Sequence, residues 1–198
     1  MKKFEIIWRE ILTQALEERK REFFQTQLAR KFHVSTSTVF HALVKPRAIG
    51  AVKIGKKECA LVDFDKLLLL WATERNLKRD IIYETHIDLP ILEIEGLLPG
   101  DVLPTAYTSY RLQFDIVPAD YDRVVVYASG LESIQKRFPP QKGRATLTVL
   151  QPDPFLASMK TVSLVQLYVD LWSLPQWYGR DFYLAVYQKI EEKLGTSV

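Results

Sequence analysis

The composition of this 198-residue chain is most informative in what it has little of. It contains one cysteine, Cys59, which excludes an intrachain disulfide, and its three histidines lie too far apart in the sequence to form a metal site with it. None of the eight glycines belongs to a GxGxxG or GxxxxGKS/T loop, so the usual phosphate-binding loops are missing. No apolar run reaches the roughly 18 residues that a membrane-spanning helix needs. We therefore expect no cofactor, no metal and no membrane partner.

The start of the chain, Met1-Lys2-Lys3, resembles the basic beginning of a secretory signal. However, Glu5 and Arg9 interrupt the apolar pattern that follows, long before it reaches a usable length. Apolar residues make up 47% of the chain and charged residues 26%, which is an ordinary globular balance. We expect a soluble protein of the reducing cytoplasm.

Few residues show a catalytic pattern. Asp115, Asp120 and Asp122 could together hold a metal ion, but they lie in a proline-containing loop, where aspartate is a favoured turn residue. The segment Glu191-Glu192-Lys193 matches the E-x-K motif of nucleases, yet it lies at the end of a predicted helix rather than on a strand. His86 has no cysteine, serine or carboxylate pair beside it in the sequence. We expect that the protein is not an enzyme, and a DNA-tethered metal-dependent nuclease or nucleotidyltransferase is the competing hypothesis.

Charge is distributed unevenly along the chain. Residues 1–80 contain 17 Lys and Arg against 10 Asp and Glu, a net charge of +7. Residues 81–198 contain 10 against 14, a net charge of −4, so the overall +3 hides a polarised molecule. Neutralising phosphates is the main sequence-independent source of DNA affinity, so the basic first segment is where nucleic acid should bind.

The stretch from Phe24 to Leu43 predicts two short helices joined by a tight turn. His33 lies at the turn, where φ is expected to be positive, and Ser35 can cap the second helix by accepting a backbone N–H. Val39 and Leu43 recur at the spacing of a buried helix face. This pattern indicates a helix-turn-helix whose second helix enters the major groove, with a structural helical hairpin as the alternative.

A predicted β-hairpin follows. Pro46 is expected to stop the second helix near Lys45. Residues 51–54 and 59–62 then predict two strands, with Lys56 and Lys57 at the turn between them. A helix-turn-helix followed by a basic hairpin is a winged helix, and its tip would reach phosphate or the minor groove. An ordinary solvated turn is the alternative.

The candidate DNA-contacting residues are those that these patterns leave facing outward: Gln25, Thr26, Gln27, Ser35, Thr36, Ser37, Thr38, Phe40, His41, Lys45, Arg47, Lys53, Lys56 and Lys57. Duplex DNA is favoured over RNA, because neither a GXXG loop nor a strand with exposed aromatic residues is visible. The second helix offers neither Arg nor Gln as a base reader, so specificity should come from Thr36, Ser37 and His41, from the wing, or from DNA shape.

The organisation of the whole chain predicts a mixed α+β fold. A first helix over Phe4 to Leu16 carries Glu5, Arg9, Glu10 and Gln14 on its polar side, and a helix capped by Asp63 runs to about Arg75. We place a boundary near residue 78, between a winged helix-turn-helix domain over 1–78 and a small α/β domain over 79–198. The second part predicts strands at 81–85, 123–128 and 144–150 and helices at 89–97, 105–112, 131–137, 163–172 and 179–194. Their strand order cannot be assigned from the sequence. Thr105 is expected to cap the helix that it starts.

The second part is also rich in aromatic residues. Trp177 and Tyr178, beside Gly179 and Arg180, form either an exposed cluster suited to a protein interface or the packing of a loop between two helices. A third hypothesis is that this part is a sensor that binds a small-molecule effector in an aromatic-lined pocket, which would make the protein a ligand-sensing transcription regulator.

The chain resembles bacterial and archaeal winged-helix transcription regulators through Gln27-Leu28-Ala29, Val34-Ser35 and Thr38-Val39 to Leu43. The second part is similar to the C-terminal region of AbiEi-type antitoxins of type IV toxin–antitoxin systems. The stretches that carry this similarity are Pro104-Thr105-Ala106-Tyr107, the helix from Val162 to Leu171, and Gly179-Arg180-Asp181-Phe182. The resemblance implies an autorepressor that binds its own promoter and counters a nucleotidyltransferase toxin encoded beside it. A homodimer that pairs two half-sites is also expected.

Overall fold

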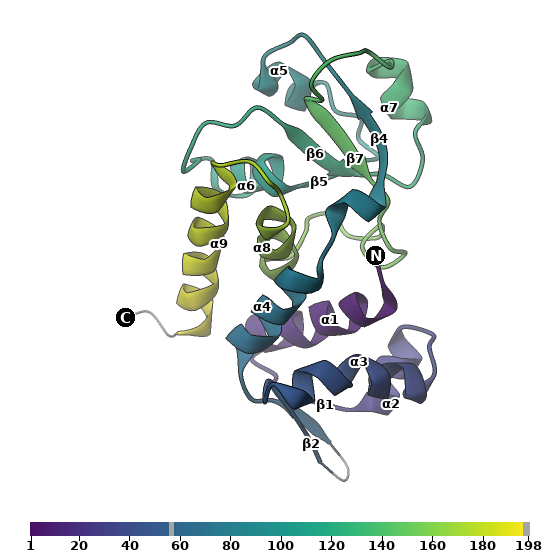
Figure 1. Ribbon diagram of the computed structural model, residues 1–198, viewed down its shortest axis with the longest axis vertical. Helices are drawn as coiled ribbons and strands as arrows, with labels where there is room; N and C mark the ends of the chain where they lie inside the picture. The colour runs from purple at the N-terminus through teal and green to yellow at the C-terminus, as the bar shows by residue number, and fades with distance from the viewer. Residues whose placement is uncertain (56–57, 196–198) are drawn as a thin grey trace.

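The computed structural model describes residues 1–55 and 58–195. The fold is mixed α+β, as predicted, with helices packed on a three-stranded and a four-stranded sheet (Figure 1). The elements in chain order are α1 (Lys3–Glu17), β1 (Glu22–Phe23), α2 (Gln25–Lys31), α3 (Thr36–Ala48), β2 (Val52–Ile54), β3 (Cys59–Leu61), α4 (Phe64–Glu74), the 3₁₀ turn η1 (Leu77–Asp80), β4 (Ile81–Thr85), α5 (Ile91–Gly96), β5 (Leu103–Thr105), α6 (Ala106–Phe114), β6 (Val124–Tyr127), α7 (Glu132–Arg137), β7 (Leu147–Leu150), α8 (Leu164–Trp172) and α9 (Gly179–Leu194). Within the described ranges, no helix combines the length and apolar character that crossing a bilayer requires.

The first part contains the predicted helix-turn-helix and hairpin. Helices α1, α2 and α3 enclose a core to which Leu12, Leu28 and Leu43 contribute, each almost fully buried. Strands β2 and β3 pair antiparallel, as predicted, and Cys59 is buried in β3. The sequence analysis missed β1, a two-residue strand that adds to the other side of β3 and completes a sheet of order β1-β3-β2.

The second part is built on a sheet of order β4-β7-β6-β5. The two central strands, β6 and β7, pair in parallel, while β4 and β5 pair antiparallel at the two edges. Alternation along β6 divides the core into two layers: Val124 and Val126 pack with α5 and α7, and Val125 and Tyr127 belong to the core that includes α6 and α8. The predicted strands and helices are all present, whereas β5 and η1 were not predicted.

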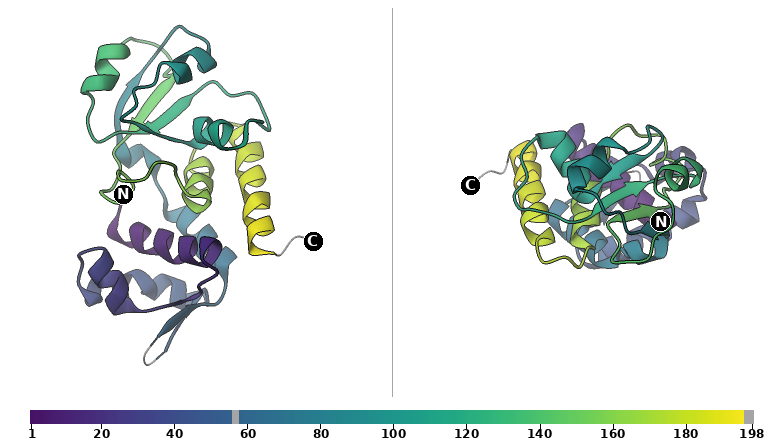
Figure 2. Two further views of the ribbon diagram at one scale, coloured as in Figure 1. Left: turned by 180° about the vertical axis from the view of Figure 1, so that it is seen from behind. Right: turned by 90° about the horizontal axis from the view of Figure 1, so that it is seen from above.

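The two parts share a buried interface. Helices α1 and α4 of the first part pack against α8, and α1 also contacts α9. One hydrophobic cluster extends from Leu12 and Leu67 to Leu167 and Phe182. The α3 helix and the β2–β3 hairpin therefore lie at one end of the molecule and the four-stranded sheet at the other (Figure 1, Figure 2). The boundary near residue 78 falls within η1 and stays a prediction.

Three local predictions are wrong. Pro46 does not stop α3, which continues to Ala48. Thr105 precedes α6 but makes no side-chain cap, because its hydroxyl donates to Asp170 Oδ2 at 2.8 Å. Glu5 and Arg9 were placed on a solvated face of α1, yet they are 2% and 3% exposed, because α1 is covered on both sides.

The aromatic pair of the second part is divided between surface and core. Trp177 is 82% exposed, whereas Tyr178 is buried and packs edge-on against Tyr107. Tyr107 also packs against Tyr121 and Phe182, so most of this aromatic density forms the core beneath α9. Of the two alternatives that the sequence left open, exposure therefore holds for Trp177 and packing holds for Tyr178.

Candidate nucleic-acid interface

The turn between α2 and α3 has the geometry that the sequence predicted. His33 adopts φ of 51°, and the Val34 N–H donates to the Ala29 carbonyl at 3.0 Å, which reverses the chain after α2. The Ser35 side chain caps α3 by accepting the Thr38 N–H at 3.0 Å. These short-range contacts fix the direction in which α3 leaves the turn.

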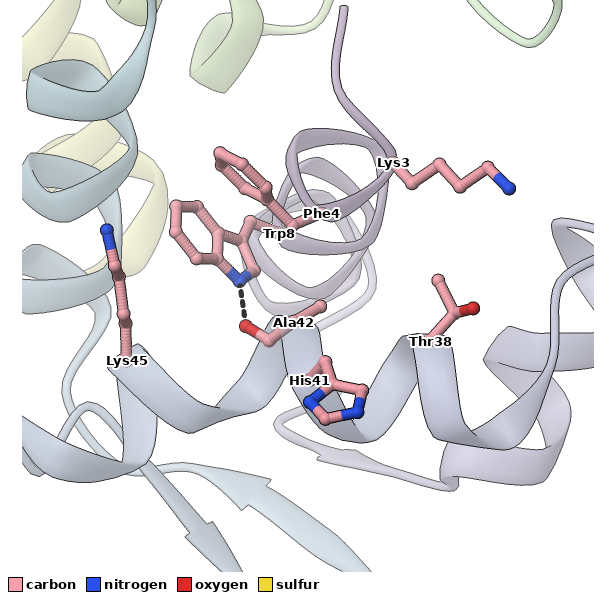
Figure 3. Close-up of a pocket in the computed structure, with 7 residues that line it drawn as sticks. All are labelled: Lys3, Phe4, Trp8, Thr38, His41, Ala42 and Lys45. Carbon is pink, nitrogen blue, oxygen red and sulfur yellow. Dashed lines mark hydrogen bonds between the residues drawn. The ribbon is translucent and has the colours of Figure 1, made fainter.

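Helix α3 passes through Pro46 without breaking because another residue replaces the missing backbone donor. Proline has no N–H to donate to the carbonyl four residues earlier, which belongs to Ala42. The Trp8 indole Nε1–H of α1 donates to that carbonyl instead, at 2.7 Å (Figure 3). The contact ties α3 to α1 and extends α3 past the proline, which brings Arg47 onto the helix.

One face of α3 is exposed, and none of the residues that the structure describes covers it. Ser37, His41 and Lys45 follow each other at four-residue spacing along it, and all three are exposed. A parallel row contains Phe40 and Val44, which are 44% and 48% exposed. An exposed helix with polar and apolar rows side by side offers hydrogen-bonding groups to base edges and apolar groups to thymine methyls.

Hollows flank α3 on both sides. A cavity of about 380 Å³ lies between α1 and α3, and Lys3 and Lys45 stand on opposite sides of it (Figure 3). Thr38, His41 and the Trp8 ring also line this cavity. A second cavity, of about 370 Å³, lies on the other flank, beside Ile54 of the hairpin. The exposed outer face of α3 therefore lies between two hollows.

The remaining candidates surround this face. On α2, Thr26 and Gln27 are exposed, whereas Gln25 is half-buried and its amide contacts Cys59 Sγ at 3.5 Å. Thr36 is exposed at the start of α3, and the half-buried Thr38 is hydrogen-bonded to Ser35. The structure thus brings most of the predicted residues to one end of the molecule, and Gln25 and Thr38 are turned partly inward.

The cations differ in their availability to DNA. Lys45 pairs with Glu74 of α4, so a phosphate would compete with that carboxylate. Arg47 and Lys53 are exposed and form no ion pair with any other described residue. Lys56 and Lys57, the predicted wing tip, lie outside the described residues.

A buried polar network joins this end of the molecule to the other. Arg9 of α1 forms a bidentate ion pair with Asp153, at 2.8 and 2.9 Å, and also donates to Gln166 Oε1 of α8 at 3.1 Å. Gln166 in turn donates to Asp170 Oδ1 at 2.9 Å. Arg75, which follows α4, reaches the same Asp170 from the other side, at 3.3 Å. The network fixes the orientation of α1 and α4 against α8.

The environment of this network holds its groups in definite charge states. Burial alone would lower the pKa of Arg75, but Tyr127, Asp170, Glu5 and Asp80 outweigh it and raise that pKa above its ordinary value. Burial, and then the nearby Asp170 carboxylate, raises the pKa of the Tyr127 hydroxyl well above its ordinary value. Tyr127 therefore stays neutral and donates to Asp170 Oδ2 at 2.6 Å.

The sequence analysis missed this network. The available signal was the breadth of the apolar pattern in α1, where Ile6, Ile7 and Trp8 are consecutive and cannot all lie on one narrow helix face. A helix whose apolar residues extend beyond one narrow face is covered on more than one side, so charged residues among them must be buried with partners.

The carboxylates considered for a metal site do not converge. Asp122 accepts a hydrogen bond from the Tyr178 hydroxyl and forms an ion pair with Arg144 at 2.8 Å. Asp115 takes a left-handed conformation at the end of α6. Among residues 1–55 and 58–195, no group of three or more His, Cys, Asp or Glu side chains is arranged to hold a metal ion. Comparisons with protein-family models, curated proteins and solved structures found no match to this chain.

Proposed function

We propose that this protein is a sequence-specific regulator of transcription that binds double-stranded DNA through α3 and the β2–β3 hairpin, and that it works in the cytoplasm. The observation that carries the proposal is the uncovered outer face of α3, at the end of the molecule farthest from the four-stranded sheet. Ser37 and His41 on that face would contact base edges, and Phe40 would contact thymine methyls. Arg47 and Lys53 would bind the phosphates on either side.

Binding is tested with labelled fragments of the organism's own DNA, selected on the full-length protein and measured by fluorescence anisotropy. Lys56→Ala with Lys57→Ala should weaken binding to all sequences alike and make the salt dependence shallower by about 2 in log–log slope. The matched control is Lys136→Ala with Lys142→Ala, which removes two exposed lysines at the opposite end of the molecule. An unchanged slope in the first variant would show that the wing does not touch phosphate.

The recognition of DNA sequence by α3 is tested separately. Ser37→Ala or His41→Ala should change the preferred sequence more than the overall affinity, because base contacts carry about 1–3 kcal/mol of discrimination. Arg47→Gln serves as the comparison, since loss of a phosphate contact weakens binding uniformly. A uniform loss of binding in the Ser37 and His41 variants would place sequence reading elsewhere in the molecule.

The finer form of the proposal is that the protein represses its own promoter as the antitoxin of a type IV toxin–antitoxin pair. The resemblance of the second part to AbiEi-type antitoxins supports this role, and the exposed Trp177 offers that part a surface for protein contacts. This role predicts a neighbouring gene that encodes a nucleotidyltransferase. Expressing that gene should stop growth, and co-expressing this protein should restore it. The His41→Ala variant should still restore growth, because the antitoxin role is assigned to the second part. A neighbouring gene without this effect would contradict the antitoxin role while leaving DNA binding intact.

A homodimer on two half-sites is part of the proposal and is measured by sedimentation on operator DNA.

A further inference from the structure

A further cavity, away from α3, lies between the turn η1 and the four-stranded sheet of the second part. It has a volume of about 730 Å³ and opens on the face of the four-stranded sheet at its β4–β7 edge. The turn η1 forms one wall, through Leu77 and Lys78, and the loop from α8 to α9 forms another, through Leu174 and Pro175. A volume of this size is typical of sites for small organic molecules.

The cavity has an apolar floor and one polar cluster. Val125 and Leu150 supply the floor from the central strands. The polar cluster consists of Arg123, Glu84 and Thr148, from three neighbouring strand segments. Apolar walls with a few convergent polar groups are the usual composition of a ligand site, since the walls bind the body of the ligand and the polar groups orient it. The aromatic lining expected from the sequence is absent from this cavity, because the tyrosines pack the core instead.

The hydrogen-bond donors of the Arg123 side chain are poorly satisfied within the protein. This side chain is 18% exposed, and its Nε is buried without a hydrogen-bond partner among the described residues. Its Nη1 makes only long contacts, 3.4 Å to Glu84 Oε1 and 3.4 Å to Thr148 Oγ1. Glu84 is better bound to Thr148, at 2.9 Å, than to the arginine. A guanidinium has five N–H donors, and the hydrogen bonds that Arg123 makes to described residues are the two long ones from Nη1, so it retains donors for an acceptor in the cavity that it lines.

The charge of the lining favours an anion. Arg123 and Lys78 are cationic and only Glu84 is anionic, so the cavity carries a net charge of about +1 at neutral pH. A partly buried guanidinium without a firm partner is destabilising, and a carboxylate or phosphate oxygen would remove that cost through charge-assisted hydrogen bonds.

We propose that this cavity binds a small organic anion, in which a carboxylate or phosphate group is held by Arg123 and an apolar body rests on Val125 and Leu150. Arg123 is the anchoring residue, and Lys78 at η1 adds a second cation. The ligand would contact the segment that directly follows α4, where Ser173 Oγ also contacts the Arg75 carbonyl at 3.5 Å. The proposal does not depend on DNA binding, because the residues that line the cavity are not those of α3 or the hairpin and the titration contains no DNA.

The test is a titration of the full-length protein, followed by calorimetry and by two-dimensional NMR of the backbone amides. The probes are benzoate and phenyl phosphate, with uncharged benzamide and inorganic phosphate as comparisons. We expect one or both organic anions to bind and to shift the amides of Val125 and Thr148, and benzamide to bind far more weakly. Which of the two anions binds tighter distinguishes a carboxylate site from a phosphate site.

Variants decide the role of the arginine. Arg123→Gln should weaken binding of the anion by about 10- to 100-fold, since it removes a charged hydrogen-bond donor. Arg123→Lys keeps the charge but loses the planar fork, and should weaken binding by a smaller factor. The matched control is Arg144→Gln, an exposed arginine that pairs with Asp122 and does not line the cavity.

A cavity-filling variant covers the case in which Arg123→Gln fails to fold. Ala145 lines the cavity, so Ala145→Phe should block the apolar body of the ligand while Arg123 stays in place. No binding of either organic anion at millimolar concentration to the unaltered protein would overturn the proposal. Binding that Arg123→Lys and Ala145→Phe leave unchanged would overturn it as well.

Discussion

The contact between Trp8 and the proline-containing helix permits a sharp test of the structure. The Ala42 carbonyl in α3 is buried and has lost its ordinary donor to Pro46, so the Trp8 indole N–H is its replacement. Trp8→Phe removes that donor but keeps an aromatic ring in the same position. Pro46→Ala does the opposite, because alanine at position 46 supplies a backbone N–H that can reach the Ala42 carbonyl.

The magnitude follows from the cost of an unpaired carbonyl. Leaving a buried acceptor without a partner costs about 1–3 kcal/mol, and the smaller ring of phenylalanine adds a packing loss that is the same with or without the proline. Trp8→Phe should therefore destabilise the protein more in the presence of Pro46 than after Pro46→Ala. The difference between the two values, which is the coupling free energy, should be about 1–2 kcal/mol.

The assay is urea unfolding of the unaltered protein, the two single variants and the double variant. Unfolding is followed by far-ultraviolet circular dichroism, because the Trp8 substitution changes fluorescence. The Trp177→Phe variant is the control, since that indole is 82% exposed and should contribute little to stability. Additive effects of Trp8→Phe and Pro46→Ala, within about 0.5 kcal/mol, would refute the reasoning.

Two further predictions concern the buried network. Burial alone would raise the pKa of Asp153, but hydrogen bonds and charge from Arg9 outweigh it and hold that pKa below its ordinary value. Such a carboxylate stabilises the fold at neutral pH, and this stabilisation is lost as pH falls below about 4, so Asp153→Asn should make the free energy of unfolding less dependent on pH between about 5 and 2. The same pH dependence in the variant and the unaltered protein would contradict this. Arg75→Met should cost about 3–5 kcal/mol, because it leaves the Asp170 carboxylate buried without its cation, whereas Lys193→Met, which breaks an exposed pair with Glu17, should cost about 0–1 kcal/mol. Equal losses in urea unfolding would show that burial does not strengthen the Arg75 contacts.

Local signals predicted the helices well, because the residues that start and end a helix lie within a few positions of it. Ser35 and Asp63 cap α3 and α4 by accepting backbone N–H groups, as their positions indicated. His33 takes the predicted positive φ. The exposure of Ser37 and His41 also followed from helical spacing alone, so most of the candidate interface could be placed from the sequence.

Features that depend on distant residues could not be predicted in this way. The strand β1 has only two residues and exists because β3 is available to pair with it. The length of α3 depends on Trp8, 38 positions before Pro46, and no pattern around the proline reveals that donor. The order of the four-stranded sheet and the cavity beside Arg123 likewise arise only when η1, β7 and the α8–α9 loop are brought together.

The ion network beneath α1 bears on how the protein can be dissected. A fragment that ends near residue 78 would keep Arg9 and Arg75 but lose Asp153 and Asp170, and it would expose to water the apolar side of α1 and α4 that now faces α8. Arg9 would then lack its carboxylate partner, and Arg75 would keep Glu5 but lose Asp170. The exposed hydrophobic surface beside these groups favours aggregation. In our proposal α3 contacts DNA, and it packs on α1, which side chains of the second part hold in place. A shortened chain would lose that support.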